Sequence, residues 1–176
     1  DTLESRGLGD VYKRQAEIMS EQGYDALTID YQHGMIGFSD LLTMLQSIRN
    51  SGVTPICRVS SLDHAVISKV MDAGALGIIC PMINNRKQAE QLVKDSKYPP
   101  VGIRSFGPTR ANFTVSSNYF YESNDGTFCL AMIETQEAFD KADKIIKIDI
   151  INNRLIPNAM EPRAANADYN PSTEEI

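Results

Sequence analysis

The stretch Met-Asp-Ala-Gly-Ala-Leu-Gly-Ile-Ile-Cys-Pro-Met, residues 71–82, contains the repeating unit of the fold in its shortest form. It starts at the end of an apolar helical pattern, which stops at Gly74, and continues into the apolar residues 76–80. Glycine often ends a helix, and a short apolar run bounded by turn residues is typical of a buried strand. The stretch therefore predicts a helix that turns directly into a strand, and Pro81 ends that strand.

Three further apolar runs each end in a side chain that could take part in a reaction. The run ends are Asp30, which His33 follows three residues later, Arg58, and Glu134. When parallel strands form a barrel or an open sheet, their carboxyl ends gather on one face, and active sites form there. The sequence therefore predicts that an imidazole, a guanidinium and carboxylates share one face of the protein.

Helical patterns separate these runs. Leu41, Leu45 and Ile48 recur at helical spacing after Ser39, a favourable N-cap, and Gly52 stands where a helix-ending glycine is expected. Further helices are predicted after Arg58, over residues 86–97 and after Glu134, where apolar positions are Ala138, Phe139, Ala142, Ile145 and Ile146. Residues 101–123 are expected to form loops with a short helix.

This alternation predicts an α/β fold of parallel strands with right-handed crossovers. Periodicity does not distinguish a barrel from an open sheet. A complete TIM (β/α)8 barrel takes about 250 residues. The 176 residues of this chain would therefore form a partial one.

Composition narrows the class of protein. Hydrophobic residues make up 42% and charged residues 23%, which is ordinary for one globular domain. A net charge of −6 and the lack of a basic stripe argue against nucleic acid as a partner. The apolar runs are too short to span a membrane and no secretory pattern is present, so we expect a cytoplasmic protein. Cys57, Cys80 and Cys129 lack metal-ligand spacing and are predicted to be reduced, buried thiols.

Five segments together resemble the HpcH/HpaI family of class II, metal-dependent, pyruvate-specific aldolases. They are residues 30–34, 55–58, 71–82, 98–104 and 132–135. The resemblance covers residues 16–149 and implies a barrel of the phosphoenolpyruvate/pyruvate-domain type. It also implies cleavage of a 4-hydroxy-2-oxo acid, such as 4-hydroxy-2-oxoheptanedioate, to pyruvate and an aldehyde through a metal-stabilised enolate.

The resemblance assigns catalytic roles residue by residue. His33 matches the base, and Asp72 matches the carboxylate that raises the basicity of this histidine. Arg58 matches the arginine that stabilises the enolate and the transition state. Glu134 matches one of two acidic ligands of a divalent cation, which is magnesium, manganese or cobalt. Asp30, in the same motif as His33, is counted with the catalytic residues.

These residue types suit the implied reaction, although the residues alone leave alternatives open. An imidazole titrates near neutrality, a guanidinium stabilises a developing oxyanion, and carboxylates are preferred ligands of hard cations. Arg58 could instead pair with a neighbouring acid, and Glu134 could cap the helix that it precedes.

Substrate contacts are expected from Met132, Arg104 and Pro81. Met132 stands where the family usually has a glutamine, which removes a polar contact to the substrate. Arg104 could recognise a substrate carboxylate or be a solvated loop residue. The aspartate that the family uses as second metal ligand is missing from the corresponding residues 155–161.

The predicted organisation has three parts. Residues 1–15 form a leader outside the family, in which residues 8–15 resemble translated adapter sequence, and residues 16–149 form the partial barrel. Residues 150–176 form an irregular or frame-disturbed tail. The family implies a small-molecule 2-oxo acid substrate and a homo-oligomer in the full-length form. The alternatives are an acyl-CoA lyase resembling the citrate lyase β-subunit and an inactive barrel fragment.

Overall fold

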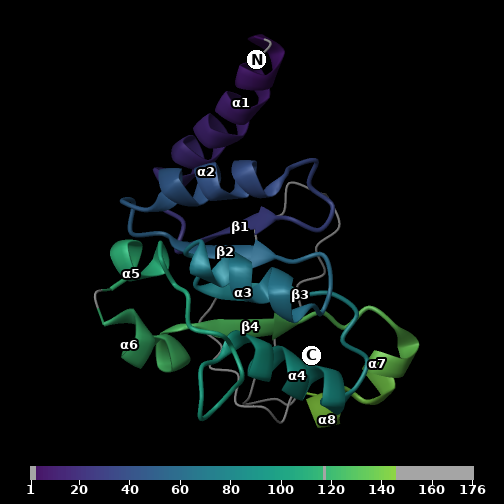
Figure 1. The fold of residues 1–176 in the computed structure, drawn as a ribbon. Coiled ribbons are helices and arrows are strands. Elements are labelled where there is room, and N and C mark those ends of the chain that lie inside the picture. Colours follow the sequence, from purple (N-terminus) through teal and green to yellow (C-terminus); the bar gives the residue numbers. More distant parts are fainter. Residues whose placement is uncertain (1–2, 117, 146–176) are drawn as a thin grey trace.

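The computed structural model describes residues 3–116 and 118–145, and its centre is one parallel sheet (Figure 1). The strands lie in the order β1-β2-β3-β4, and every neighbouring pair is parallel. Their bounds are β1 Ala26–Asp30, β2 Thr54–Arg58, β3 Gly77–Cys80 and β4 Phe128–Ala131. Parallel neighbours need a crossover connection, and helices supply it in each case. The predicted fold class is confirmed as a partial barrel-type α/β fold.

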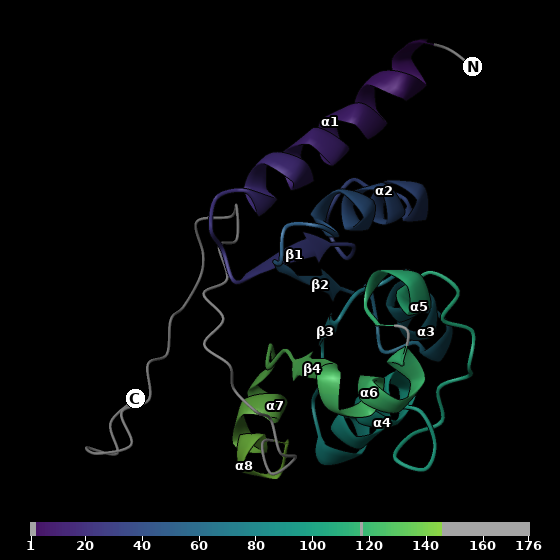
Figure 2. The ribbon, with the colours of Figure 1, turned by 90° about the vertical axis from the view of Figure 1, so that its left-hand side faces the viewer.

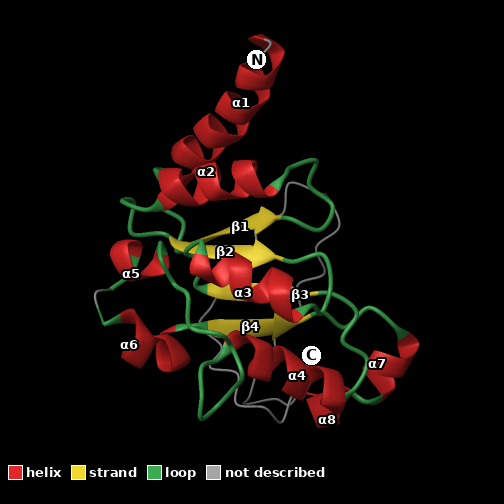
Figure 3. Cartoon of the chain, viewed as in Figure 1, coloured by secondary structure: helices red, strands yellow, loops and turns green. Residues whose placement is uncertain are grey.

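Eight helices are described around this sheet (Figure 3). Helix α1 precedes the first strand, α2 and α3 each connect two strands, and α4, α5 and α6 lie between β3 and β4. Their bounds are α1 Leu3–Ser20, α2 Phe38–Ile48, α3 His64–Asp72, α4 Arg86–Ser96, α5 Ala111–Thr114, α6 Tyr119–Gly126, α7 Gln136–Asp140 and α8 Ala142–Ile145. Figure 2 shows α2, α3 and α4 on one side of the sheet.

The core lies between these helices and the sheet. It includes Leu41, Leu45 and Ile48 of α2, which were predicted to share one helical face, and these residues pack with Ile29 and Ile78 of the strands. Burial of such side chains removes apolar surface from water and is the main force that holds the strands in register. Within the described part of the chain, no helix is long and apolar enough to cross a bilayer.

The helix ends follow the sequence with three differences. Gly74 directly follows the C-cap of α3 and has φ +110°, the left-handed region that glycine enters without steric cost. Gly52 also has a positive φ, +80°, but it lies in the turn after α2, whose C-cap is Arg49. Helix α2 begins after Gly37 instead of Ser39, because the Asp40 carboxylate accepts the Gly37 N–H at 2.8 Å. The helix predicted after β4 is divided into α7 and α8, and Phe139, expected in the core, is 70% exposed.

Helix α1 runs across the predicted boundary between residues 1–15 and 16–149, and Ala16 belongs to the core. The boundary itself stays a prediction. The predicted tail, residues 150–176, and the segment 155–161 lie outside the described residues.

All three cysteines are free thiols, as predicted. Cys57 and Cys80 are buried, and burial raises the pKa of each thiol to about 12. Because thiolates and not thiols attack disulfide reagents, we expect neither to react with an aromatic disulfide at pH 8 in the native protein. Both should react within minutes in concentrated urea. Reaction of more than one thiol per folded chain would contradict this burial, because Cys129 is only partly buried and can account for one.

Candidate active site

The carboxyl ends of the four strands lie along one edge of the sheet, as the sequence predicted (Figure 1). The Cα of Asp30 is in register with that of Arg58, so the ends of β1 and β2 are level. Cys80, the last residue of β3, is in register with Ala131, the last of β4. His33 follows the first strand, and Glu134 follows the last. Parallel pairing thus gathers side chains that are distant in sequence.

Asp30 and Arg58 form a bidentate ion pair across the first two strands. The Arg58 Nε donates to Asp30 Oδ1 at 2.9 Å, and its Nη2 donates to Oδ2. Asp30 Oδ1 also accepts the backbone N–H groups of Gln32 at 3.0 Å and His33 at 3.1 Å. Burial alone would raise the pKa of Asp30, but these hydrogen bonds hold it below its ordinary value. The carboxylate therefore stays charged and fixes both the arginine and the loop.

His33 lies on this loop with an exposed side chain. Its backbone is held by Asp30, whereas its imidazole makes no hydrogen bond within the described residues. An imidazole that is placed by its backbone and open to solvent can exchange a proton with a bound small molecule. Gln32 beside it has a buried Oε1 that lacks a hydrogen-bond partner among the described residues.

Glu134 is positioned by the loop that follows β3. Its Oε2 accepts the backbone N–H of Met82 at 2.8 Å, and Met82 adopts a left-handed conformation with φ 58°. The hydroxyl of Thr135 donates to Asn84 Oδ1 at 2.6 Å and thereby joins the same two loops. Thr135 also caps α7 by accepting the Ala138 N–H at 3.1 Å. Helix capping, the alternative considered for Glu134, is therefore carried out by its neighbour.

The described residues fit one ligand position of a hard cation. Glu134 is an exposed carboxylate on a fixed loop, and one of its oxygens is already oriented by a backbone N–H. Mg²⁺ often takes only one or two carboxylates from a protein and fills its other positions with water and substrate oxygens. No group of three or more His, Cys, Asp or Glu side chains suited to a metal occurs in the described part of the chain. Glu134 alone is therefore the candidate ligand here.

Arg104 and Asp72, two of the predicted site residues, form an ion pair with each other. Arg104 is fully buried, and its Nη2 donates to Asp72 Oδ1 at 2.6 Å. The same guanidinium donates to the hydroxyl of Tyr119 at 3.0 Å and lies over the ring of Tyr98. Asp72 ends α3, which runs antiparallel to the strands and so brings it to the edge where they begin.

This arrangement bears on two expectations. The Arg104 side chain has no exposed surface, so it is not the solvated loop residue that the sequence left open, and its substrate contact stays a prediction. The partner of Asp72 within the chain is Arg104, so the geometry of one chain gives no support to the predicted effect of Asp72 on His33.

Pro81 and Met132, predicted to contact the substrate, do lie at the strand ends. Pro81 is buried directly after β3, and the Met132 N–H bonds to the Cys80 carbonyl at 2.9 Å. Their substrate contacts stay predictions. Gln32 and the Met82 N–H were not predicted as site groups from the sequence. Their only signals were position, between Asp30 and His33 in one case and directly after the third strand in the other.

The family model of the HpcH/HpaI aldolase/citrate lyase family matches residues 12–156. The chain belongs to this family. The resemblance stated from the short motifs is thereby confirmed, and the matched region includes every strand of the sheet.

Several family members are close in sequence. Hydroxypyruvate/pyruvate aldolase of Rhizorhabdus wittichii is 40% identical over 141 residues, which are 80% of this chain and 56% of the relative. The 2-dehydro-3,6-dideoxy-6-sulfogluconate aldolase of Pseudomonas putida is 32% identical and covers 76% of this chain and 53% of the relative. The chain thus spans about half the length of the curated relatives it matches.

Solved structures with the same fold include a named member of the family and a citrate synthase. The HpcH/HpaI aldolase from Desulfitobacterium hafniense superposes with a TM-score of 0.68 at 28% identity and covers 76% of this chain and 53% of that one. The citrate synthase SbnG superposes with a TM-score of 0.69 at 31% identity, over 78% of this chain and 53% of that one. These matches relate the four-stranded sheet to part of a larger barrel-type structure.

Proposed function

We propose that the protein is a carbon–carbon lyase that cleaves a 4-hydroxy-2-oxo acid to pyruvate and an aldehyde. The observation that carries the proposal is the common edge of the sheet shared by Asp30, His33, Arg58 and Glu134. The similar relatives are named as aldolases, and this supports the same class of reaction. A small-molecule substrate, a cytoplasmic location and a homo-oligomer of the full-length form belong to this proposal.

The size of the site suits a small substrate. Neighbouring strands lie about 4.8 Å apart, so the ends of β1 and β4 are at most about 14 Å apart. Arg58 ends β2 and Glu134 follows β4 by three residues, so the two groups stand at different points of this interval. A short oxo acid can therefore contact groups from both sides at once.

The cleavage needs a base and a group that stabilises the negative charge that develops on the substrate. The C3–C4 bond breaks as the 4-hydroxyl loses its proton, the aldehyde leaves, and C3 then takes up a proton to become the methyl group of pyruvate. His33 is the group that we assign to move the proton. The guanidinium of Arg58 is held by Asp30 and is aimed at the charge that develops on the 2-oxo oxygen. A divalent cation bound at Glu134 would withdraw charge from the oxo acid as a Lewis acid.

Proton exchange tests this proposal without knowledge of the aldehyde. The purified chain with Mn²⁺ should exchange the methyl protons of pyruvate for deuterium in D₂O, which proton NMR follows directly. Exchange in the presence of excess EDTA should fall to the rate of the buffer. If no exchange occurs although Mn²⁺ binds, the result rejects a lyase and favours the inactive barrel fragment.

Removal of the Glu134 carboxylate tests the metal assignment. Glu134→Gln keeps the size of the side chain and an acceptor for the Met82 N–H, but it removes the charge that a hard cation prefers. We expect Mn²⁺ affinity to fall at least tenfold, as measured by electron paramagnetic resonance of free Mn²⁺. Glu137→Gln on α7, whose carboxylate pairs with Lys141, is the matched control. Equal loss in both variants would contradict a site at Glu134.

A second candidate is an acyl-CoA lyase, because the family description includes citrate lyases. Coenzyme A should then bind tightly and compete with pyruvate. The small interval between the strand ends favours the oxo-acid reaction. Calorimetric titration with coenzyme A and with pyruvate separates the two.

A further inference from the structure

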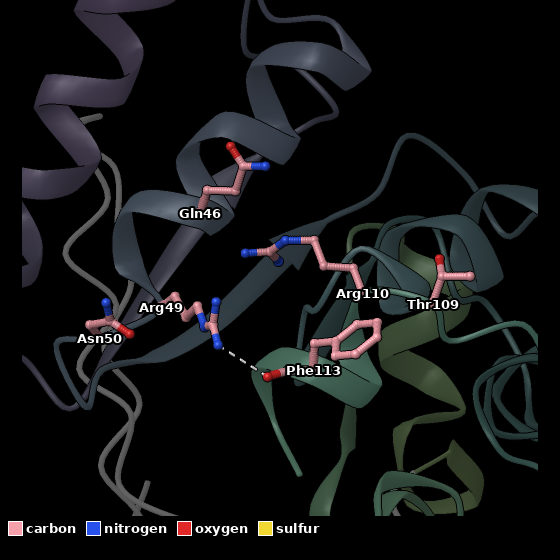
Figure 4. A pocket seen from close by; sticks show the side chains of 6 residues that line it. All are labelled: Gln46, Arg49, Asn50, Thr109, Arg110 and Phe113. Carbon is pink, nitrogen blue, oxygen red and sulfur yellow. Dashed lines mark hydrogen bonds between the residues drawn. The ribbon is translucent and has the colours of Figure 1, made fainter. Parts of the chain in front are cut away.

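A second group of polar side chains lies at the opposite edge of the sheet, where the strands begin. A pocket of about 590 Å³ opens there between the carboxyl end of α2 and the start of α5 (Figure 4). Its lining consists of two arginines, two amides, a threonine and an aromatic ring: Gln46, Arg49, Asn50, Thr109, Arg110 and Phe113. None of these residues takes part in the proposed active site.

The two arginines concentrate positive charge in a chain whose net charge is −6. Arg49 donates through Nη2 to the Phe113 carbonyl at 3.1 Å, and Arg110 donates through Nη1 to the Ala73 carbonyl. Both of these acceptors are neutral carbonyl groups, and no acidic side chain is among the described residues that line the pocket. Figure 4 shows both guanidinium groups in the space between α2 and α5.

The electrostatic effect of Arg49 on Arg110 also favours an anion at this pocket. Burial lowers the pKa of Arg110, and the positive charge of Arg49 lowers it further. Like charges held close together are relieved by an anion bound between them. A guanidinium presents several N–H donors in one plane and matches a carboxylate with two parallel hydrogen bonds.

A smaller, mostly apolar pocket of about 200 Å³ adjoins the same two side chains. Arg49 and Arg110 line both pockets, so they stand at the junction. The walls of the smaller pocket include Leu45, Leu76 and Val115. A ligand that fills both spaces must carry a charged group at the arginines and an apolar part behind it.

We propose that this site binds a small organic acid, with its carboxylate between Arg49 and Arg110 and a short apolar body in the smaller pocket. The site is separate from the proposed active site, since β2 alone places about 13 Å between Thr54 at the pocket and Arg58. Binding here needs no divalent cation.

Hexanoate is a suitable probe, because it has one carboxylate and an unbranched apolar body. Isothermal titration calorimetry of the full chain, in EDTA so that the result is independent of the lyase proposal, should detect hexanoate with a Kd in the millimolar range or below. 1-Hexanol and inorganic phosphate should each bind at least tenfold more weakly. Equal affinity for 1-hexanol would overturn the role of the arginines, and equal affinity for phosphate would overturn the role of the apolar pocket.

Two variants test the named contacts. Arg49→Gln should weaken hexanoate at least tenfold, whereas Arg86→Gln, an exposed arginine on α4, should leave it unchanged. Val115→Asn should weaken hexanoate and leave the weak binding of phosphate unaltered, because Val115 lines only the apolar part. Thermal unfolding checks that each variant is folded. Hexanoate binding that is equal in Arg49→Gln and the unsubstituted chain rejects the site.

Discussion

Replacement of His33 by alanine is expected to slow the exchange of pyruvate methyl protons 10²- to 10⁴-fold, the range typical of a lost general base. His33 has an exposed imidazole on a loop that Asp30 holds through two backbone N–H groups. The substitution removes the ring and leaves those backbone hydrogen bonds in place. We therefore expect the fold and the affinity for Mn²⁺ to be unchanged, and the loss to appear in the exchange rate alone.

The chain contains only one other histidine, and it is a natural control. The Nδ1 of His64, at the start of α3, lies 3.0 Å from Asp95 Oδ1, so this ring already has a hydrogen-bond partner. His64→Ala removes an equal ring and should leave the exchange rate per folded molecule within about twofold of the unsubstituted chain. If both variants lose exchange equally, or if His33→Ala retains it, the proton is moved by another group and the lyase proposal loses its base.

The strand ends could be predicted because the signal for them is local. A short apolar run between turn residues identifies a buried strand, and parallel strands have only one edge for their carboxyl ends. The sequence therefore predicts that Arg58 and Glu134 lie on the same edge of the sheet. The hydrogen-bond partners of these residues are harder to predict from the sequence. Arg58 was expected to pair with a neighbouring acid as one alternative, and the structure identifies this acid as Asp30, 28 residues earlier in the chain.

The roles that could not be predicted depend on pairs distant in sequence. The sequence left Arg104 open between a substrate contact and a solvated loop residue, whereas its hydrogen bonds to Asp72, 32 residues earlier, and to Tyr119 hold it in the interior. Phe139 continues an apolar helical period, but such a period specifies only which residues share a face. Whether that face is covered depends on the rest of the structure, and the described residues leave Phe139 exposed.

The second large effect is expected at Arg104, as a loss of stability. Arg104→Met should lower the free energy of unfolding by about 3 kcal/mol, because removal of one partner of a buried ion pair leaves the other uncompensated. Such a removal typically costs about 3–5 kcal/mol. We expect a loss at the low end because the Asp72 side chain is 26% exposed and can be hydrated by water. Urea unfolding followed by circular dichroism measures the change.

Two comparisons decide whether the buried pair is the cause. Arg86→Met, which removes an exposed arginine that pairs with Glu90 on the same helix, should cost less than about 1 kcal/mol. The double variant Arg104→Met with Asp72→Leu should be more stable than Arg104→Met alone, because it also removes the carboxylate that the single substitution leaves without an ion-pair partner. A loss that the second substitution does not reduce would mean that the contacts of Arg104 with the rings of Tyr98 and Tyr119 carry the stability instead.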